Sequence, residues 1–588
     1  MILQALYKYY HRKAQDPESA LAPAGFEYKE IPFILELRED GTLNQIEDTR
    51  YIENKKKRAK SERVPQGVKK TSGVAANLLW DNAEYVLGLD TKGKPERVKE
   101  QQVAFLEKIR ALNLADTDKG IAAVIYFLES LDLAIIQQNP LWEEIEKTNP
   151  NLTFRLQGQT HLVCQSRPVQ AAIANGDYAE AAKAICLITG EIAEIERLHP
   201  AIKGVWGAQT AGANIISFNL DAFRSFGKQQ SFNAPVSKEA AFAYTTALNH
   251  LLGKDSKQRM QVGDASTVFW ASKRDGLEDS FAAIWGASSS KDDPDRNTQA
   301  VKSVYEAVEK HGRSPALDEQ TVFYVLGLAP NAARISVRFW YMATVREISQ
   351  RIVQHFNDLE IERSAWQEPY LPLWKLLKSI ALLGKTENIP PELAGEVMRR
   401  ILAGLPYPET LLASAIRRNH AEQNVTYERA AIIKACLNRN YGEGLDVKLD
   451  TDNTHIGYRL GRLFAILEKL QAEAHDRKLS ADVADKYYSS ASTNPINAFP
   501  VLIKLHKHHL NKLRKQKFGR AVQFDQWLGE LFAGLNAPSS GQNSIYPKTL
   551  SLAEQGNFSV GYYHQRQFFF TKDDENVTSN TKNQGDTE

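Results

Sequence analysis

The spacing of apolar residues changes once along this chain, near residue 343, and that change limits the folds it can adopt. Before it, short runs rich in β-branched and aromatic residues, such as "STVFWAS" from Ser266, are mixed irregularly with helical stretches. After it, only helical spacing continues. We therefore expect an α+β fold, in which a mixed N-terminal region with short, mostly antiparallel strands precedes an all-α C-terminal region that ends in a helical bundle.

The first region contains a clear hairpin pattern in "IPFILELREDGTLNQIEDT", with a turn at Glu39-Asp40-Gly41. "MILQALYKYYHRKAQD" is typical of an amphipathic helix rather than of a signal peptide. Further strands are predicted from Leu152, Ala184, Gly212, Ser266, Thr321 and Ala333. Further helices are predicted from Pro95, Ser237 and Asn297.

The helical part shows its own subdivisions, because the loop "EGLDVKLDTDNTHIG" interrupts a series of helical stretches. The helices after this loop match a compact four-helix bundle, which we expect to fold independently. The last residues are too polar to bury an apolar face. We predict an N-terminal region over 1–342, a helical connecting region over 343–454, the bundle over 455–535, a C-terminal motif segment over 536–571 and a disordered tail over 572–588.

Composition limits the partners of the chain. Its 588 residues have a formal net charge of only +2, so a polyanion must be met by local clusters of charge. The cysteines, Cys164, Cys186 and Cys436, are far apart and odd in number, which favours a reducing compartment and hence the cytoplasm. No run approaches the 18 to 20 apolar residues that span a bilayer, so no membrane partner is expected.

Catalytic and metal-binding motifs are missing from the sequence. There is no HExxH and no GxSxG, and "KGVWGAQTAGANIISFN" lacks the Lys-Ser or Lys-Thr of a phosphate-binding P-loop. The group His506, His508 and His509 has no carboxylate or Cys neighbour, so it is more typical of a basic helix face than of a metal site. We predict no catalytic residue, metal or cofactor, although scattered acids such as Asp292 and Asp293 leave a carboxylate pair open.

Positive signals come from clusters of basic residues. Eight Lys or Arg residues lie between Lys55 and Lys70, against one acid, Glu62. Pro65 and Gly67 break the segment and favour an exposed loop, which either is simply solvated or lays its cations along phosphates. Short polar residues follow, and these can read base edges. The candidate contacts are Lys55, Lys56, Lys57, Arg58, Lys69, Lys70, Thr71, Ser72 and Asn77.

A second cluster lies between residues 501 and 520, which contain seven Lys or Arg residues and no acid. Helical spacing places Leu502, Leu505, Leu510 and Leu513 on a core face and the cations opposite them. The alternative is a solvated helix, which would show no marked dependence of DNA binding on salt. The candidate contacts are Lys504, Lys507, Lys512, Arg514, Lys515 and Arg520.

A third candidate is the loop before the helix predicted from Ser237. Phe223, Phe226 and Phe232 lie there among polar residues, and such aromatics are more often core residues than platforms for stacked bases. The N-terminus of the following helix offers backbone N–H groups to a phosphate. The candidate contacts are Lys228, Gln229, Gln230, Asn233 and Ser237.

Five segments carry a resemblance to a known family. They are "MILQALYKYY", "LAPAGF", "LHPAIKGVWGAQTAGANIISFN", "NAPVSKEAAFAYTTALNHLL" and "QGNFSVGYYHQRQ", in this order over nearly the whole chain. Together they resemble the Csd-type large subunit of the type I-C CRISPR surveillance complex called Cascade.

This resemblance implies an RNA-guided DNA-binding assembly. The large subunit of such an assembly recognises a short protospacer-adjacent motif, helps to open the duplex and receives a helicase-nuclease. The implied partners are CRISPR guide RNA, double-stranded target DNA and its displaced strand, the backbone and handle-binding subunits, small subunits made from the same gene, and the helicase-nuclease. Because guide pairing reads the sequence, such a subunit needs no active site of its own. The alternatives are a stand-alone metal-dependent nuclease and a sequence-independent single-strand-binding scaffold.

Overall fold

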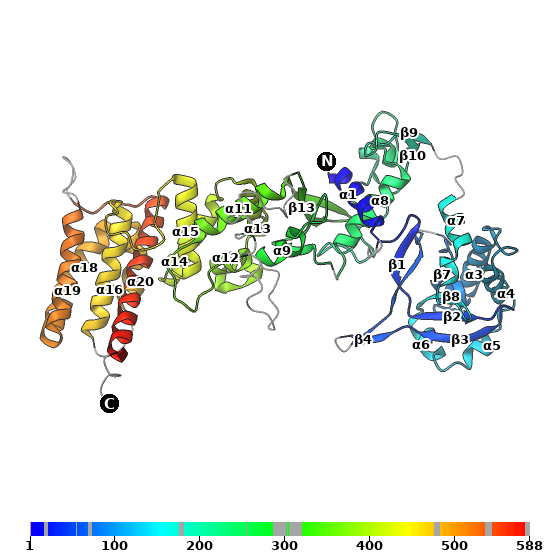
Figure 1. The fold of residues 1–588 in the computed structure, drawn as a ribbon, viewed down its shortest axis with the longest axis horizontal. Helices are drawn as coiled ribbons and strands as arrows, with labels where there is room; N and C mark the ends of the chain where they lie inside the picture. The colour runs from blue at the N-terminus through cyan, green and yellow to red at the C-terminus, as the bar shows by residue number, and fades with distance from the viewer. Residues whose placement is uncertain are drawn as a thin grey trace. The chain divides into compact units, whose positions relative to one another are not determined.

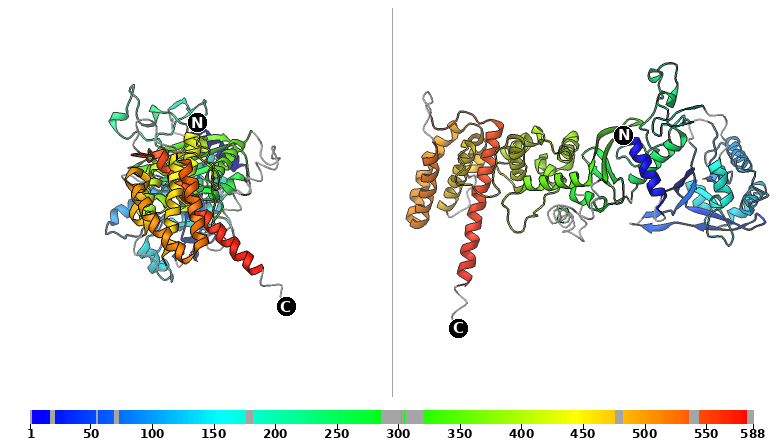
Figure 2. Two further views of the ribbon diagram at one scale, coloured as in Figure 1. Left: turned by 90° about the vertical axis from the view of Figure 1, so that its left-hand side faces the viewer. Right: turned by 45° about the horizontal axis from the view of Figure 1, so that its top comes forward.

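The computed structural model of the chain (Figures 1 and 2) describes residues 2–16, 21–53, 56–68, 73–175, 182–254, 256–285, 302, 304, 320–475, 482–535 and 544–582. The chain forms two compact units. Unit 1 comprises Met1–Ile202 and Asn214–His250, and unit 2 comprises Lys203–Ala213 and Leu251–Glu588.

Unit 1 is built from short strands and short helices. The strands are β1 (Phe26–Glu30), β2 (Phe33–Leu37), β3 (Leu43–Asp48), β4 (Tyr51–Glu53), β5 (Lys56–Arg58), β6 (Ser61–Pro65), β7 (Trp80–Asn82), β8 (Asn151–Leu156), β9 (Lys183–Ile185) and β10 (Ile192–Glu194). The helices are α1 (Ile2–Ala14), α2 (Ala83–Val86), α3 (Pro95–Arg110), α4 (Lys119–Glu129), α5 (Leu133–Gln137), α6 (Trp142–Thr148), α7 (Arg167–Asn175) and α8 (Lys238–Leu251).

The main sheet of unit 1 has the strand order β3-β2-β8-β7. Only the β2–β8 pairing in it is parallel, and the other pairings are antiparallel. All five residues of β2 are buried, and α3 and α4 bring Phe105 and Phe127 to 6.3 and 6.1 Å from the ring of Phe154 on β8. This apolar face explains why the segments from Ile31 and Leu152 form strands in the interior of the unit.

Unit 2 begins with a sheet and continues with helices. Its strands are β11 (Arg259–Val262), β12 (Ala265–Ala271), β13 (Val322–Asn331) and β14 (Arg334–Thr344), all antiparallel and in this order. Its helices are α9 (Leu277–Trp285), α11 (Val345–Leu359), α12 (Leu373–Ile380), α13 (Pro391–Ala403), α14 (Glu409–Glu422), α15 (Tyr427–Cys436), α16 (Ile456–Ala474), α17 (Val483–Thr493), α18 (Pro495–Gln516), α19 (Phe518–Gly534) and α20 (Leu552–Lys582).

The change from strands to helices occurs at Thr344, next to the predicted boundary. Thr344 ends β14 and caps α11, since its hydroxyl accepts a bond from the Glu347 N–H at 3.2 Å. The Glu347 carboxylate in turn accepts a bond from the Thr344 N–H at 2.9 Å. This reciprocal capping box satisfies backbone groups that the first helical turn leaves unpaired.

The C-terminal bundle contains α20 in addition to the four predicted helices. Figures 1 and 2 show α20, in red, beside α16. A Cβ atom at Gly457 or Gly461 of α16 would meet the backbone of α20, and one at Gly561 of α20 would meet the backbone of Tyr458. Because these glycines lack a Cβ, the backbones of α16 and α20 can pack directly against each other.

The structure confirms the α+β class, the hairpin of β2 and β3, and the helices predicted from Pro95 and Ser237. The strand predicted from Gly212 is wrong: this stretch contains isolated bridge residues and bends but no strand, and the Asn214 side chain donates to the carbonyl oxygens of His199 and Pro200. Helices α4 to α7 and α9 were not predicted. Most of the helix predicted from Asn297 lies outside the described residues.

The domain boundaries predicted at residues 342, 454, 535 and 571 stay predictions, as does independent folding of the bundle. The predicted tail, 572–588, overlaps the end of α20, and residues 583–588 lie outside the described part of the chain.

Candidate nucleic-acid interface

The basic segment between Lys55 and Lys70 consists largely of short strands. β5 pairs with β4 in a two-stranded antiparallel ribbon, and β6 pairs with β1. Figure 1 shows this ribbon extending away from the main sheet of unit 1. The prediction of a loop is wrong here, because Val64 is buried in the core and strand pairing satisfies the backbone around it. Lys55 lies outside the described residues, and only the backbone of Lys56 is described.

Acidic residues lie close to the base of the ribbon. Arg50 donates to both carboxylate oxygens of Asp48, at 2.7 and 2.6 Å, and to Glu144 at 2.8 Å. Hydrogen bonding from Arg50 lowers the pKa of Glu144, so this carboxylate is ionised at neutral pH. The exposed Lys57 has its Nζ 3.7 Å from Glu144. Its charge is therefore partly compensated, and Arg58 beside it is half-buried.

The candidates Lys69, Lys70, Thr71 and Ser72 lie outside the described residues, but both ends of their segment are fixed. On one side, the Gly67 N–H donates to Glu27 at 3.0 Å. The Val68 N–H donates to the side-chain oxygen of Asn77 at 2.9 Å, across the segment. Asn77 is itself buried, so its amide fixes Val68, the last described residue before this segment.

Further cations contact the described residues that follow this segment, and sequence reasoning missed them. Arg97 donates to the Gly73 carbonyl at 3.4 Å, and Lys108 donates to the Ala76 carbonyl at 2.7 Å. Lys92, Lys94 and Arg97 line a cavity of about 280 Å³ together with Glu84 and Asp90, and Lys92 pairs with Glu84 at 2.8 Å. The run "KGKPERVK" from Lys92 contains four Lys or Arg residues and one acid, Glu96, and is the sequence feature that could have indicated them.

The loop before α8 presents a fully exposed aromatic residue. Ser225 and Lys228 form an antiparallel bridge, and Phe226 and Gly227 between them have φ values of 50° and 70°. These are the positive values that a tight two-residue hairpin turn requires. Phe226 is 97% exposed, so the expectation of a core residue is wrong for it.

The polar candidates of this loop divide into two groups. Asn233 accepts a bond from the Ser225 N–H at 3.1 Å and donates to the Gln230 carbonyl at 2.9 Å, so it fixes the turn that carries Phe226. Gln230 accepts a bond from Arg197 at 3.1 Å. The buried Ser237 accepts a bond from the Ala240 N–H at 3.2 Å and thus occupies one of the donors predicted for a phosphate. Lys228 and Gln229 are exposed.

Helix α18 of unit 2 carries a cationic face. Leu502, Leu510 and Leu513 are buried as predicted, whereas Leu505 is 38% exposed, contrary to the prediction, because the core contact lies on the other side of the helix at this turn. Four lysines are exposed and form no ion pair with any described residue: Lys504, Lys507, Lys512 and Lys515.

The arginine candidates at the end of this helix region have acidic partners. Arg514 pairs with Asp525 on α19. Arg520 donates to both oxygens of Glu473 at 2.8 and 2.7 Å and lies over the Trp527 ring. This bidentate pair joins α19 to α16, so Arg520 has a structural partner that a phosphate would have to replace.

His506 and His509 of α18 add little charge to this face at neutral pH. Burial lowers the pKa of both His506 and His509, and the positive residues near His509 add to the effect. Both rings are therefore neutral at pH 7. Within the described residues, no group of three or more His, Cys, Asp or Glu side chains is arranged to hold a metal ion.

Other predictions concern the cysteines and the membrane. Cys164, Cys186 and Cys436 are buried and form no disulfide bond with one another. None of the helices among the described residues combines the length and apolar character needed to cross a bilayer. Whether the named candidates contact nucleic acid stays a prediction.

Comparison with known proteins identifies the family of the chain. No curated protein matches it. The family described as "CRISPR-associated protein (Cas_Csd1)" matches residues 6–570, which is nearly the whole chain and includes both units. The chain therefore belongs to the Cas_Csd1 family and is a CRISPR-associated protein of Cascade type.

Proposed function

We propose that this chain is the large subunit of a type I-C CRISPR surveillance complex and has no enzymatic activity of its own. It recognises the protospacer-adjacent motif, binds target DNA, supports R-loop formation and recruits the helicase-nuclease in the bacterial cytoplasm. Its partners are the guide RNA, the target duplex and displaced strand, the backbone and handle-binding subunits, small subunits from the same gene, and the helicase-nuclease.

The observation that most supports DNA binding is the cationic face of α18. Lys504, Lys507 and Lys512 are exposed on a regular helix whose opposite side is packed in the bundle, and no described acid pairs with them. Each lysine that neutralises a phosphate releases counterions, so binding weakens as salt is added. A guide-directed complex requires this kind of sequence-independent grip, because base pairing supplies the specificity.

Unit 1 supports the proposal for motif recognition. A two-stranded ribbon such as β4–β5 fits the major groove of DNA, where base edges are distinguishable. Bonds from the Gly67 and Val68 N–H groups to Glu27 and Asn77 fix the described residues that precede Lys69 and Lys70 in the chain. Phe226, exposed at the tip of its turn, offers a ring on which a base exposed by duplex opening can stack.

The test uses the assembled complex with its guide RNA. Labelled duplexes that share the target sequence are compared with an intact and a scrambled adjacent motif, in the presence of Mg²⁺ and in the absence of the helicase-nuclease. We expect stable capture of the intact-motif duplex only, with no cleavage. Equal capture of both duplexes would support a sequence-independent scaffold, and cleavage lost on substitution of one carboxylate would support a metal-dependent nuclease.

A further inference from the structure

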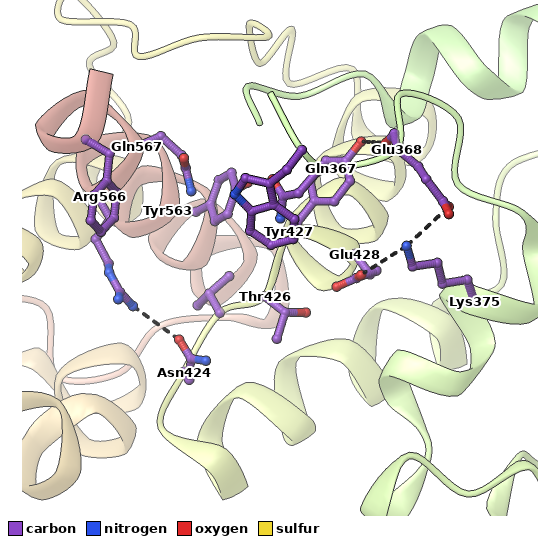
Figure 3. A pocket seen from close by; sticks show the side chains of 13 residues that line it. Gln367, Glu368, Lys375, Asn424, Thr426, Tyr427, Glu428, Tyr563, Arg566 and Gln567 are labelled. Atoms are coloured by element: carbon purple, nitrogen blue, oxygen red, sulfur yellow. Dashed lines mark hydrogen bonds and ion pairs between the residues drawn. The ribbon is translucent and has the colours of Figure 1, made fainter. Parts of the chain in front are cut away.

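A cavity of about 530 Å³ lies in unit 2, between the α11–α12 connection, the start of α15 and α20 (Figure 3). Its lining includes the aromatic residues Trp366, Tyr427, Tyr563 and Phe570. The volume is within the range of sites that bind a small molecule or a single monomer unit of a biopolymer. It is separate from the α18 face and from the unit 1 candidates, none of which lines it.

Trp366 is presented to this cavity by a fixed turn. The Gln367 N–H donates to the Ser364 carbonyl at 3.0 Å, and the Gln367 side chain accepts a bond from the Ser364 N–H at 2.9 Å. Arg363 adds a bond to the Gln367 carbonyl at 2.9 Å. The indole is nevertheless 84% exposed, so it contributes little to the stability of the unit. A large aromatic side chain held out on an ordered turn is typical of a binding surface.

The floor of the cavity is also fixed before any ligand binds. The Tyr427 hydroxyl donates to the Glu368 carbonyl at 3.0 Å, and the Tyr563 hydroxyl donates to the Glu362 carbonyl at 2.9 Å. Both tyrosines are buried. A ligand would therefore meet aromatic walls that need little reordering, which reduces the entropic cost of binding.

Charged groups lie at opposite ends of the cavity, as Figure 3 shows. At one end, Lys375 lies 3.2 Å from Glu368 and 3.9 Å from Glu428, so the two carboxylates share one lysine. At the other end, Arg566 donates through Nη1 to Asn424 at 3.1 Å. Its Nε and Nη2 groups have no hydrogen-bond partner among the residues that the structure describes.

This arrangement favours an anionic ligand with a flat ring. The donors that Arg566 leaves unused match the oxygens of a phosphate, and an exposed indole stacks on any nucleobase. A cationic peptide side chain is less favoured, because it would face Arg566 at one end of the cavity and Lys375 between the two carboxylates at the other.

We propose that this cavity binds one unpaired nucleotide, with its base against Trp366 and its phosphate against Arg566. The proposal rests on the proposed function, which brings single-stranded nucleic acid to this subunit. It adds a base-stacking site to the phosphate grip of α18. The nucleotide comes either from a DNA strand or from the guide RNA, which share this chemistry.

The test measures binding of the full chain to single strands that lack an adjacent motif. The probes are a labelled thymidine oligonucleotide and an abasic strand of equal length, which keeps the phosphates and has no bases. We expect Trp366→Ala to weaken binding of the thymidine strand about tenfold and to leave the abasic strand unchanged, because stacking requires a base. Trp366→Phe should retain most of the affinity. The matched control is Trp206→Ala, which removes an indole that is 64% exposed and does not line the cavity.

A second variant examines the phosphate contact. Arg566→Gln should lower the salt slope of binding by about one for both strands, because one phosphate contact is lost. Comparing deoxyribose and ribose oligonucleotides assigns the site to DNA or RNA, and a Trp366-dependent loss with either one supports the proposal. Unchanged affinity of Trp366→Ala for both would overturn it, as would reduced assembly of the complex with unchanged strand binding, which indicates a protein partner. Motif-dependent duplex capture is measured separately, so its failure would count against the proposed function alone.

Discussion

The β4–β5 ribbon of unit 1 and helix α18 of unit 2 are both rich in Lys and Arg, yet they present these charges differently. At the ribbon, Lys57 lies 3.7 Å from Glu144, and Lys60 lies 2.7 Å from Glu62. On α18, Lys504 and Lys507 have no acidic partner among the described residues. By the number of basic residues alone, the two regions look equivalent. The structure distinguishes them by whether their lysines are paired with acidic residues.

The difference indicates different roles. Charges already paired with acids gain less from a phosphate, because the existing ion pair must be broken. The α18 face therefore suits contacts to the phosphate backbone, whereas the ribbon suits positioning and short contacts to base edges.

The largest expected effect is on acid stability. Burial lowers the pKa of His355 and of His564 in unit 2 to about 3, with the positive residues Arg439 and Lys434 adding to the effect. In the unfolded chain these groups titrate near pH 6.5, so below that pH the unfolded state binds protons that the folded state excludes. The stabilisation is thus complete above about pH 6.5 and lost as the pH falls toward 3. At pH 4.5 the two residues together lower the free energy of unfolding of unit 2 by roughly 5 kcal/mol.

Urea titrations at pH 7.5 and 4.5, followed by circular dichroism, measure this loss. In unit 1, burial lowers the pKa of His199 to about 4, so this residue makes a similar contribution of its own there. We expect the unfolding transition of unit 2 to shift more with pH than the unfolding transition of unit 1. Equal midpoints of unfolding at the two pH values would contradict the buried, neutral state of His355 and His564.

The next effect concerns the helix pair that supports the α18 face. Gly461→Val places a branched side chain against the backbone of α20 and should lower the free energy of unfolding of unit 2 by about 3 kcal/mol. The control is Gly529→Ala in α19, where a Cβ meets open space. That change should raise stability by about 0.5 to 1 kcal/mol. Equal stability of the valine variant and the wild type in urea unfolding would mean that the close approach of α16 and α20 is wrong.

The third prediction concerns the proposed phosphate contacts of α18. Converting Lys504, Lys507 and Lys512 to Gln should lower the slope of log affinity against log salt by about three, because three phosphate contacts are lost. The corresponding change in affinity between 50 and 200 mM salt is then about fortyfold smaller than in the wild type. The control converts Arg514, already paired with Asp525, to Gln and should change the slope by less than one. An unchanged slope would mean that the α18 lysines are solvated and do not contact phosphates.

The smallest expected effect is at Lys69 and Lys70, the candidate contacts predicted from sequence for the duplex. Reversing Lys69 and Lys70 to Glu should weaken duplex capture by the assembled complex about tenfold through charge repulsion, and leave assembly intact. Filter binding measures capture, and size-exclusion chromatography measures assembly. Normal capture by this variant would remove the segment from the account of motif recognition.

The helical part of the fold was the most predictable from sequence. Helix periodicity and capping residues are local signals, and α11 begins at Val345, next to the predicted change near residue 343. The strand predicted from Gly212 failed because side-chain bonds from Asn214 to distant carbonyl groups decide the backbone there. No window of sequence contains that information.

The candidate sites were predictable only in part, for the same reason. The charges of α18 follow from spacing along one helix, whereas the role of Asn77 depends on a hydrogen bond across a loop. The cavity combines Trp366, Tyr427 and Arg566, which come from three distant segments and carry no shared local pattern. Phe226 was expected in the core because aromatic residues usually are, and its positive φ was not visible in the sequence.

The central claim is that this subunit holds nucleic acid through uncompensated lysines on α18 and does not itself cut it. The most direct measurement is mapping of lysine-to-DNA crosslinks, by mass spectrometry, in the assembled complex bound to a motif-containing duplex. The account predicts crosslinks at Lys504, Lys507 and Lys512, with the DNA intact. Crosslinks confined to other surfaces, with α18 unmodified by DNA, would contradict it.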